Sequence, residues 1–180
     1  MGLFAFLHKD VRGARLRGAS ILKELIFNPG YRVVVYYRLS EYLICRKKFQ
    51  KICKFFGYLL RVRISRVPGV EINTIHEIGS GLKLFHPHDI VIGYGTKIGR
   101  NVTIYNGVSL GGKKVRSNGG EYVSYPIVEN NVTIYPGAKV IGGCTLGKGA
   151  SIAANSVVLS DIPPNSLAVG IPAKVIKTLK

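Results

Sequence analysis

The sequence predicts a mainly β protein, a parallel β-helix of six-residue repeats, which follows a short basic α-helical region. Two observations predict this fold. Aliphatic residues return every six positions between residues 72 and 158, and neither an α-helix nor an ordinary strand has that period. Positive charge and helical patterning are concentrated before residue 70, whereas the glycines are concentrated after it. Six of the 22 glycines lie in residues 1–69, and the other 16 lie in residues 70–180.

Composition limits the class of protein. The chain has 180 residues, a formal net charge of +17 and 47% hydrophobic residues, which suits one folded domain and excludes a disordered polyelectrolyte. No uncharged apolar run approaches the roughly 18 to 20 residues that cross a bilayer. The apolar start, Met1–Leu7, is soon followed by charges and lacks the order of a secretory signal. The three cysteines form no CxxC pair, so we expect reduced thiols in a cytoplasmic protein.

Residues 1–69 are expected to form a basic amphipathic helical region with 15 basic and 3 acidic side chains. Ser20 or Asn28 can cap a helix, and Pro29 suits a first helical turn. Two interpretations are open. The apolar side packs on the rest of the protein and the basic side is solvated, or the surface lies on an anionic membrane. No nucleic-acid-binding motif accompanies the charge. The basic residues that interleave the apolar ones are Arg32, Arg38, Arg46, Lys47, Lys48, Lys51, Lys54, Arg61, Arg63 and Arg66.

Residues 70–180 carry the six-residue period and are expected to form the β-helix and a C-terminal tail. Stacked repeats bury their aliphatic residues as a continuous column, which one repeat cannot do alone. The aliphatic positions are Ile72, Ile78, Leu84 and Ile90, then Ile92, Ile98, Ile104 and Leu110, then Val128, Ile134, Val140, Leu146, Ile152 and Val158. A smaller inward residue follows most of them by four positions, and Gly or Asn fills the turns. Cys144 occupies one of these small inward positions and is expected to be a core residue.

Two interruptions break this period. The register slips by two residues between Ile90 and Ile92. From residue 111 to residue 126 the hydrophobic period is lost in a polar, basic, glycine-rich stretch. A long insertion in a compact solenoid is usually functional, so residues 111–126 are expected to form a flap that projects from one edge.

The repeats resemble the hexapeptide-repeat acyltransferases, in the branch that contains serine acetyltransferases and sugar O-acetyltransferases of surface polysaccharides. The stretches that carry the resemblance are LFHPHDIVIG at 84–93, VSLGG at 108–112, IAANSVV at 152–158 and AVGIPAK at 168–174. The resemblance implies a left-handed β-helix with three repeats per coil and a homotrimer. It also implies that acetyl-CoA binds in grooves between neighbouring β-helices.

The resemblance also assigns the chemistry. His86 matches the catalytic histidine, a general base that takes the proton of the acceptor hydroxyl, and Glu71 matches the carboxylate that orients it. The acceptor then attacks the thioester directly, without an acyl-enzyme. His88, two residues on and at an inward position of the repeat, competes with His86 for this role and is expected to bind substrate. Two histidines without a recognisable third ligand do not indicate a metal site.

Further positions match residues that hold acetyl-CoA in the family. Gly111 and Gly112 match the glycines where backbone approaches the pantetheine arm, and Ala154 matches another contact. Lys174, and more weakly Lys177, match positions where a lysine meets a phosphate of the nucleotide.

The acceptor is the least determined part of the sequence interpretation. Serine acetyltransferases carry an Arg-His pair before a proline at the end of the flap, where Ser124 and Tyr125 precede Pro126 here. Because this carboxylate clamp is missing and Tyr125 can stack on a sugar ring, we expect a saccharide acceptor. The alternatives are serine O-acetylation, with the clamp supplied by a different arginine, and a non-catalytic trimeric scaffold.

Overall fold

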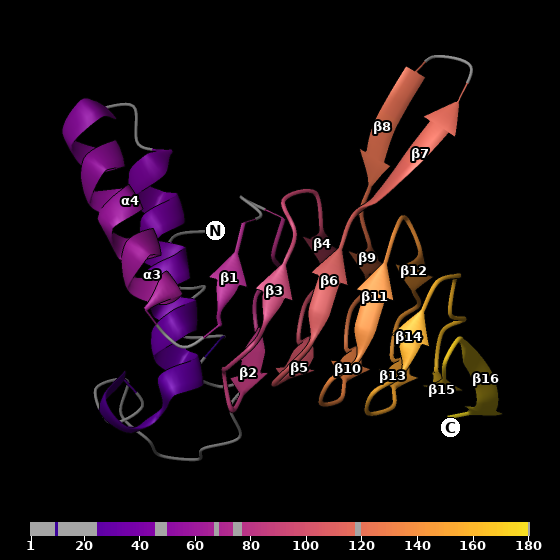
Figure 1. Ribbon diagram of the computed structural model, residues 1–180. Helices are drawn as coiled ribbons and strands as arrows, with labels where there is room; N and C mark the ends of the chain where they lie inside the picture. Colours follow the sequence, from indigo (N-terminus) through magenta and orange to yellow (C-terminus); the bar gives the residue numbers. More distant parts are fainter. Residues whose placement is uncertain are drawn as a thin grey trace.

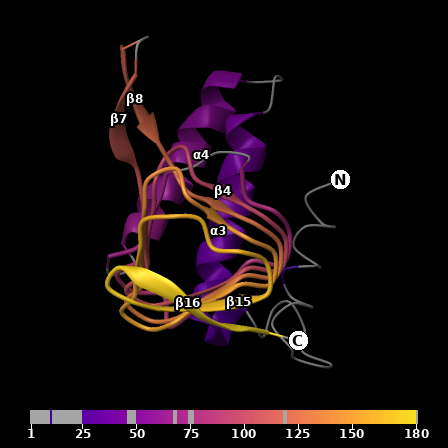
Figure 2. The same cartoon turned by 90° about the vertical axis from the view of Figure 1, so that its right-hand side faces the viewer.

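The computed structural model describes residues 10, 25–45, 50–66, 69–73, 77–117 and 120–179. A pair of helices stands at one end of a three-sided parallel β-helix, and a hairpin projects from the β-helix (Figure 1). Viewed along its axis, the coils overlay as one outline, with the hairpin at one corner (Figure 2). No helix in the described ranges is long and apolar enough to cross a membrane.

The described residues of the N-terminal part include two long helices, α3 (Pro29–Ile44) and α4 (Gln50–Ser65). The side chain of Asn28 accepts a hydrogen bond from the backbone N–H of Tyr31 at 3.1 Å, and Pro29 lies in the first turn. This is the cap that the sequence predicts at Asn28. The alternative cap, Ser20, lies outside the described residues.

The strands of the β-helix are short and form three parallel sheets. The five-stranded sheet contains β1 (Glu71–Ile72), β3 (Val91–Ile92), β6 (Ser109–Gly111), β11 (Lys139–Ile141) and β14 (Val157–Val158). The three-stranded sheet contains β4 (Lys97–Ile98), β9 (Ile127–Val128) and β12 (Thr145–Leu146). The six-stranded sheet contains β2 (Lys83–Phe85), β5 (Thr103–Tyr105), β10 (Thr133–Ile134), β13 (Ser151–Ile152), β15 (Ser166–Gly170) and the antiparallel β16 (Ala173–Thr178).

The register of the sheets confirms the six-residue repeat. Leu84 pairs with Ile104, which pairs with Ile134, which pairs in turn with Ile152, so each sheet stacks one aliphatic position on the next. The smaller positions are also inside, since Val102, Val108, Val132, Ala138, Ala150 and Ser156 are completely buried and Cys144 nearly so. Burial raises the pKa of the Cys144 thiol, which suits the predicted core role.

Left-handed backbone conformations line two of the three corners. The corner between the three-stranded and six-stranded sheets holds one such residue in every coil, and they are Gly81, Asn101, Asn131, Gly149 and Asn165. Asn tolerates a positive φ better than most residues, and Gly adopts it without a steric cost. The glycines also make room, because a Cβ on Gly149 would collide with Oδ1 of Asn165 in the next coil. The Gly and Asn turns of the sequence therefore have a steric basis.

The predicted flap is a two-stranded antiparallel hairpin, β7 (Lys113–Ser117) and β8 (Gly120–Ser124). It leaves the corner between the five-stranded and three-stranded sheets. Its outer side chains are mostly exposed.

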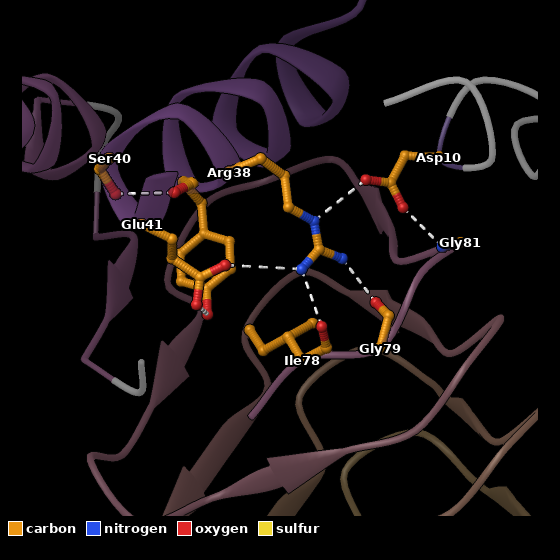
Figure 3. A network of polar contacts seen from close by, with 8 residues as sticks. Asp10, Arg38, Ser40, Glu41, Ile78, Gly79 and Gly81 are labelled. Atoms are coloured by element: carbon orange, nitrogen blue, oxygen red, sulfur yellow. Dashed lines mark hydrogen bonds and ion pairs between the residues drawn. The ribbon is translucent and has the colours of Figure 1, made fainter. Parts of the chain in front are cut away.

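A buried polar network joins α3 to the first coil (Figure 3). Arg38 forms an ion pair with Asp10 at 3.2 Å and donates to the backbone oxygens of Ile78 and Gly79 at 2.8 and 2.5 Å. Asp10 accepts from the N–H of Gly81. Burial raises the pKa of Asp10, against the opposing pull of Arg38. These contacts satisfy main-chain groups that another coil would otherwise satisfy.

This network corrects one sequence interpretation. Arg38 is buried and Arg61 is partly buried, with Arg61 donating to the backbone oxygen of Ile72 at 2.7 Å. Both had been counted in the basic surface. They point instead at the β-helix, because its first coil has unpaired carbonyl groups and no preceding coil.

Candidate active site

His86 lies where the chain turns from the six-stranded to the five-stranded sheet, and this turn is two residues longer than the turns that follow it at the same corner. From Leu84 to Ile92 is a step of eight residues, whereas Ile104 to Leu110 and Ile134 to Val140 are steps of six. Two residues of this corner are left-handed, His86 with φ 50° and Asp89 with φ 53°. The N–H of His88 donates to the backbone oxygen of His86 at 2.8 Å. Non-glycine residues in this conformation are uncommon and cluster at functional sites.

The two extra residues correct the positions predicted for Ile90 and His88. Ile92, not Ile90, stacks on Ile72, and Ile90 is the completely buried smaller-position residue of that coil. His88 was expected in that inward position. It is exposed instead, and its Nδ1 lies 3.3 Å from Oδ2 of Asp89. The insertion moves the inward position from residue 88 to residue 90, so both histidines stay on the surface.

A groove opens between this corner and the helices. His86, Pro87, His88 and Asn106 line it from the β-helix side, and Pro29, Arg32, Tyr36, Arg63 and Arg66 line it from the helical side. Three arginines therefore share one groove with two histidines. Sequence reasoning had placed these arginines in a general basic surface. Nothing in the spacing of residues 32, 63 and 66 links them to residue 86, since only the helix packing brings them there.

An aromatic ladder follows the same corner and was also missed. Phe85 stacks on Tyr105 with ring centroids 5.1 Å apart, and Tyr105 stacks on Tyr135 at 5.4 Å. Each of these residues directly follows an inward aliphatic residue of the six-stranded sheet. That shared offset in the repeat is the signal that could have identified the ladder.

Glu71 lies on the coil before the His86 corner. It is exposed on β1 and pairs with Val91, and Asp89 of the His86 corner lies against Gly69. The two corners are thus stacked neighbours although the residues are 15 apart. Among the described residues, no hydrogen bond joins Glu71 to His86, so an orienting role for Glu71 stays a prediction.

The residues predicted to hold acetyl-CoA lie on two corners and one strand. Ala154 is exposed at the corner that carries His86, where Asp89, Gly107, Gly137 and Asn155 have positive φ in successive coils. The turns that carry His86 and Ala154 are therefore three coils apart. At about 4.8 Å per coil, this separation is about 14 Å along the axis of the β-helix.

The other donor positions lie elsewhere on the chain. Gly111 ends β6, and Gly112 begins the connection to the flap on the opposite edge of the five-stranded sheet. Lys174 and Lys177 are exposed on β16. A single chain therefore does not bring Gly112 and His86 together.

Tyr125 packs on its own chain at the base of the flap. A Cβ on Gly93 or Gly95 would lie 2.9 or 2.5 Å from ring atoms of Tyr125, and one on Gly112 would lie 2.7 Å from the same ring. Because they lack a Cβ, these glycines leave room for the half-buried ring. Tyr125 thus anchors the flap, and these glycines occupy ring surface that the sequence interpretation had offered to a sugar.

No group of three or more His, Cys, Asp and Glu side chains suited to a metal ion occurs within the described ranges. The groove itself presents imidazole and guanidinium groups, which can transfer a proton and bind an anion.

Comparison with known proteins identifies the class. A family model described as bacterial transferase hexapeptide (six repeats) matches residues 125–160. Serine acetyltransferase from Helicobacter pylori (strain ATCC 700392 / 26695) is 39% identical over 154 residues, which are 84% of this chain and 84% of that protein. Serine acetyltransferase from Buchnera aphidicola subsp. Schizaphis graminum (strain Sg) is 39% identical over 175 residues, and this chain spans 96% of its own length but 64% of the relative.

Solved structures agree with this likeness. Neisseria gonorrhoeae serine acetyltransferase in complex with serine gives a TM-score of 0.77 at 29% identity, covering 97% of this chain and 69% of that one. The Brucella abortus strain S19 enzyme in complex with coenzyme A gives 0.79 at 28% identity, covering 98% and 68%. The fold and the sequence together define a hexapeptide-repeat transferase with a left-handed β-helix. Within that class, the chain belongs to the serine acetyltransferase family.

The family corrects the predicted acceptor. The sugar O-acetyltransferase interpretation is wrong, because the relatives that match most of the chain at 34–39% identity are serine acetyltransferases. One of the matching structures holds serine. The replacement of the Arg-His pair by Ser124 and Tyr125 therefore does not mark a sugar acceptor.

Proposed function

We propose that this protein is an acetyl-CoA-dependent serine O-acetyltransferase and that His86 is its general base. The observation that carries the proposal is the strained, lengthened corner that presents His86 to a groove rich in arginine, in a chain of the serine acetyltransferase family. Acetyl-CoA as the donor is supported by relatives solved with coenzyme A. A cytoplasmic location, expected from the sequence, stays a prediction.

The proposed reaction is a direct transfer. The imidazole of His86 removes the proton from the serine hydroxyl, and the oxygen attacks the thioester carbonyl of acetyl-CoA. The resulting tetrahedral intermediate expels coenzyme A as the carbon–sulfur bond breaks, and the imidazolium returns a proton to the sulfur. Glu71, one coil away, is proposed to hold the imidazole in the tautomer that accepts the proton. Free serine and acetyl-CoA give O-acetylserine and coenzyme A, so the step balances.

The groove supplies the recognition that the flap lacks. Serine differs from simple alcohols by its carboxylate, and a guanidinium binds a carboxylate through paired N–H donors. Arg32, Arg63 and Arg66 line the same groove as His86, so we assign carboxylate binding to them. His88, which lines the same groove, is proposed to contact the same substrate.

The donor residues favour an assembly of several copies. His86 and Ala154 lie on one edge of the five-stranded sheet, and Gly111 and Gly112 lie on the other. A ring of copies, in which one edge meets the other edge of the next copy, would bring both sets to each interface. We therefore propose a homotrimer with the donor between neighbours, as the resemblance implies, and Lys174 and Lys177 near its phosphates.

The first test measures release of the coenzyme A thiol from acetyl-CoA in the presence of serine. We expect His86→Ala to lower kcat by 10²- to 10⁴-fold, the usual contribution of a general base. The matched variant is His88→Ala, on the same corner and also exposed, which should raise KM for serine with a smaller effect on kcat. Thiol release at the wild-type rate by His86→Ala, or none by the wild type with serine, would overturn the proposal.

The second test examines the arginines. Ethanolamine has the amine and hydroxyl of serine but no carboxylate, so the wild type should prefer serine at least tenfold in kcat/KM. Arg63→Gln and Arg66→Gln should reduce that preference, mainly through KM for serine. Equal use of both compounds by the wild type would show that these arginines do not read the carboxylate.

A further inference from the structure

The outward side of α4 is apolar rather than solvated and polar. Five large side chains on it are exposed: Ile52, Phe55, Phe56, Leu59 and Val62. Their spacing of three and four residues places them on one side of the helix, and we call this stripe the outer α4 face. Phe55 is 61% exposed. An exposed apolar patch of this kind usually marks an interaction surface.

The helix cannot hide this stripe by turning about its axis, because its other side is fixed. A Cβ on Gly57 would lie 2.7 Å from Cγ1 of Ile44 and 3.1 Å from the backbone oxygen of Ser40, so α4 and α3 are in close contact there. Arg61 donates to the first coil at 2.7 Å, and Ile64 is buried. The side that faces the protein is already occupied, so the outer α4 face stays exposed.

Charge around the stripe is of one sign. Residues 42–70 contain eight Lys and Arg and no Asp or Glu. Lys51 is exposed and Lys54 half-buried on α4 itself, and Arg63 and Arg66 follow at its C-terminal end. A second copy of the chain would bring the same positive charge to a shared interface, which opposes self-association through this face. A negatively charged surface complements it.

We propose that the outer α4 face binds the surface of an anionic lipid membrane, with the helix lying in the plane of the headgroups. Apolar side chains of such a helix enter the boundary between headgroups and acyl chains by about 5–10 Å. Each basic residue near the surface adds about 1 kcal/mol. A 16-residue helix is too short to span the bilayer, so it lies on the membrane.

The absence of tryptophan from the chain makes a direct test possible. Phe55→Trp introduces a single reporter into the outer α4 face. Its emission should shift to the blue and become protected from an aqueous quencher when vesicles of phosphatidylcholine with 30% phosphatidylglycerol are added. The matched control is Leu159→Trp, at a similarly exposed apolar position of the β-helix (58% exposed), whose emission should not change.

Variants then separate the contributions to binding. Leu59→Glu and Lys51→Glu should each weaken binding to the anionic vesicles at least fivefold, whereas Leu159→Glu should leave it unchanged. Binding should fall as salt screens the charges and should be weak on pure phosphatidylcholine. Equal binding to neutral vesicles, or no binding to anionic ones, would overturn the proposal. So would a Leu59→Glu variant that lowers the oligomeric state in sedimentation, because the occupant would then be another copy.

The proposal does not depend on the acceptor of the acetyl group. Leu59→Glu should release coenzyme A with serine at the wild-type rate in the absence of vesicles. Failure of the serine assay and failure of membrane binding are therefore distinguishable results.

Discussion

Two corners of the same β-helix behave in opposite ways. At the corner between the three-stranded and six-stranded sheets, every coil takes a step of six residues, from Ile78 to Leu84 in the first coil and from Ile162 to Ala168 in the last. At the corner between the five-stranded and three-stranded sheets, the step from Leu110 to Val128 is 18 residues. The constant corner holds a left-handed Gly or Asn in each coil. The variable corner carries the flap.

The comparison separates the positions that stabilise the stack of coils from the positions that depart from the repeat. A constant step lets each backbone N–H find the same carbonyl in the next coil, so that corner stabilises the stack. Departures from the repeat occur at the His86 corner, at the flap and at the first coil, where side chains replace a missing coil. Variants at each place should have different consequences.

The largest expected effect is at the first coil. Arg38→Ala removes the guanidinium that pairs with Asp10 and caps two carbonyl groups, and breaking a buried pair costs about 3–5 kcal/mol. We expect chemical denaturation to show the loss and hydrogen exchange to locate it in α3 and the first coil. A change below 1 kcal/mol would mean that the helices are held mainly by apolar packing.

This loss should also depend on pH. Burial already raises the pKa of Asp10 above 3.8, and Arg38 opposes that rise, so its removal raises the pKa further. A carboxyl whose folded-state pKa is raised contributes its full stability below 3.8 and loses it as pH rises through the folded pKa. The penalty of Arg38→Ala should therefore be smaller at pH 4 than at pH 7, when each variant is compared with the wild type at the same pH.

The next effect concerns the lengthened corner. Deleting Pro87 and His88 restores the step of six, so circular dichroism should still report a folded β-helix. Because the deletion removes the turn that presents His86, we expect serine-dependent thiol release to fall at least 100-fold. A deletion variant that stays active would show that the two extra residues are not needed to position His86.

A smaller effect is expected at the constant corner. Gly149→Ala places a Cβ against Asn165 at a residue with φ +72°, and such strain costs about 1–3 kcal/mol. The comparison is Gly111→Ala, whose Cβ would meet only the mobile end of Ile141 at 3.0 Å. We expect that variant to lose less than about 1 kcal/mol. Equal losses of unfolding free energy from the two variants would show that the left-handed residues of this corner do not contribute specially to stability.

The smallest effect on stability should come from the flap. Replacing Lys114–Val123 with Asn-Gly keeps the Lys113–Ser124 pair and the Tyr125 anchor, and it forms a two-residue hairpin turn. The unfolding free energy should change by no more than about 0.5 kcal/mol, as measured by thermal unfolding. A large drop would show that the flap contributes to the core.

The sequence was sufficient for the features that repeat. Period six located the buried columns, and the Gly and Asn turns located the left-handed corners, because a stacked coil imposes the same environment every 18 residues. The pairing of Arg38 with Asp10 could not be predicted, since 28 residues separate them and no period connects them. The inward position predicted for His88 was wrong, because it was placed four residues after Leu84, and two inserted residues shift that position to Ile90. The arginine groove was missed because helices and β-helix meet there only after folding.

The final strand of the described residues reverses direction at the edge of the six-stranded sheet. β16 turns back and runs antiparallel to β15, and it places exposed Lys174 and Lys177 on the outermost strand of the six-stranded sheet. Parallel rungs with an open edge are a template on which another molecule can add its own strands. A reversed strand bearing lysines interrupts that template. The β16 strand therefore covers β15, and a chain trimmed before residue 171 would leave β15 as the exposed edge of the six-stranded sheet.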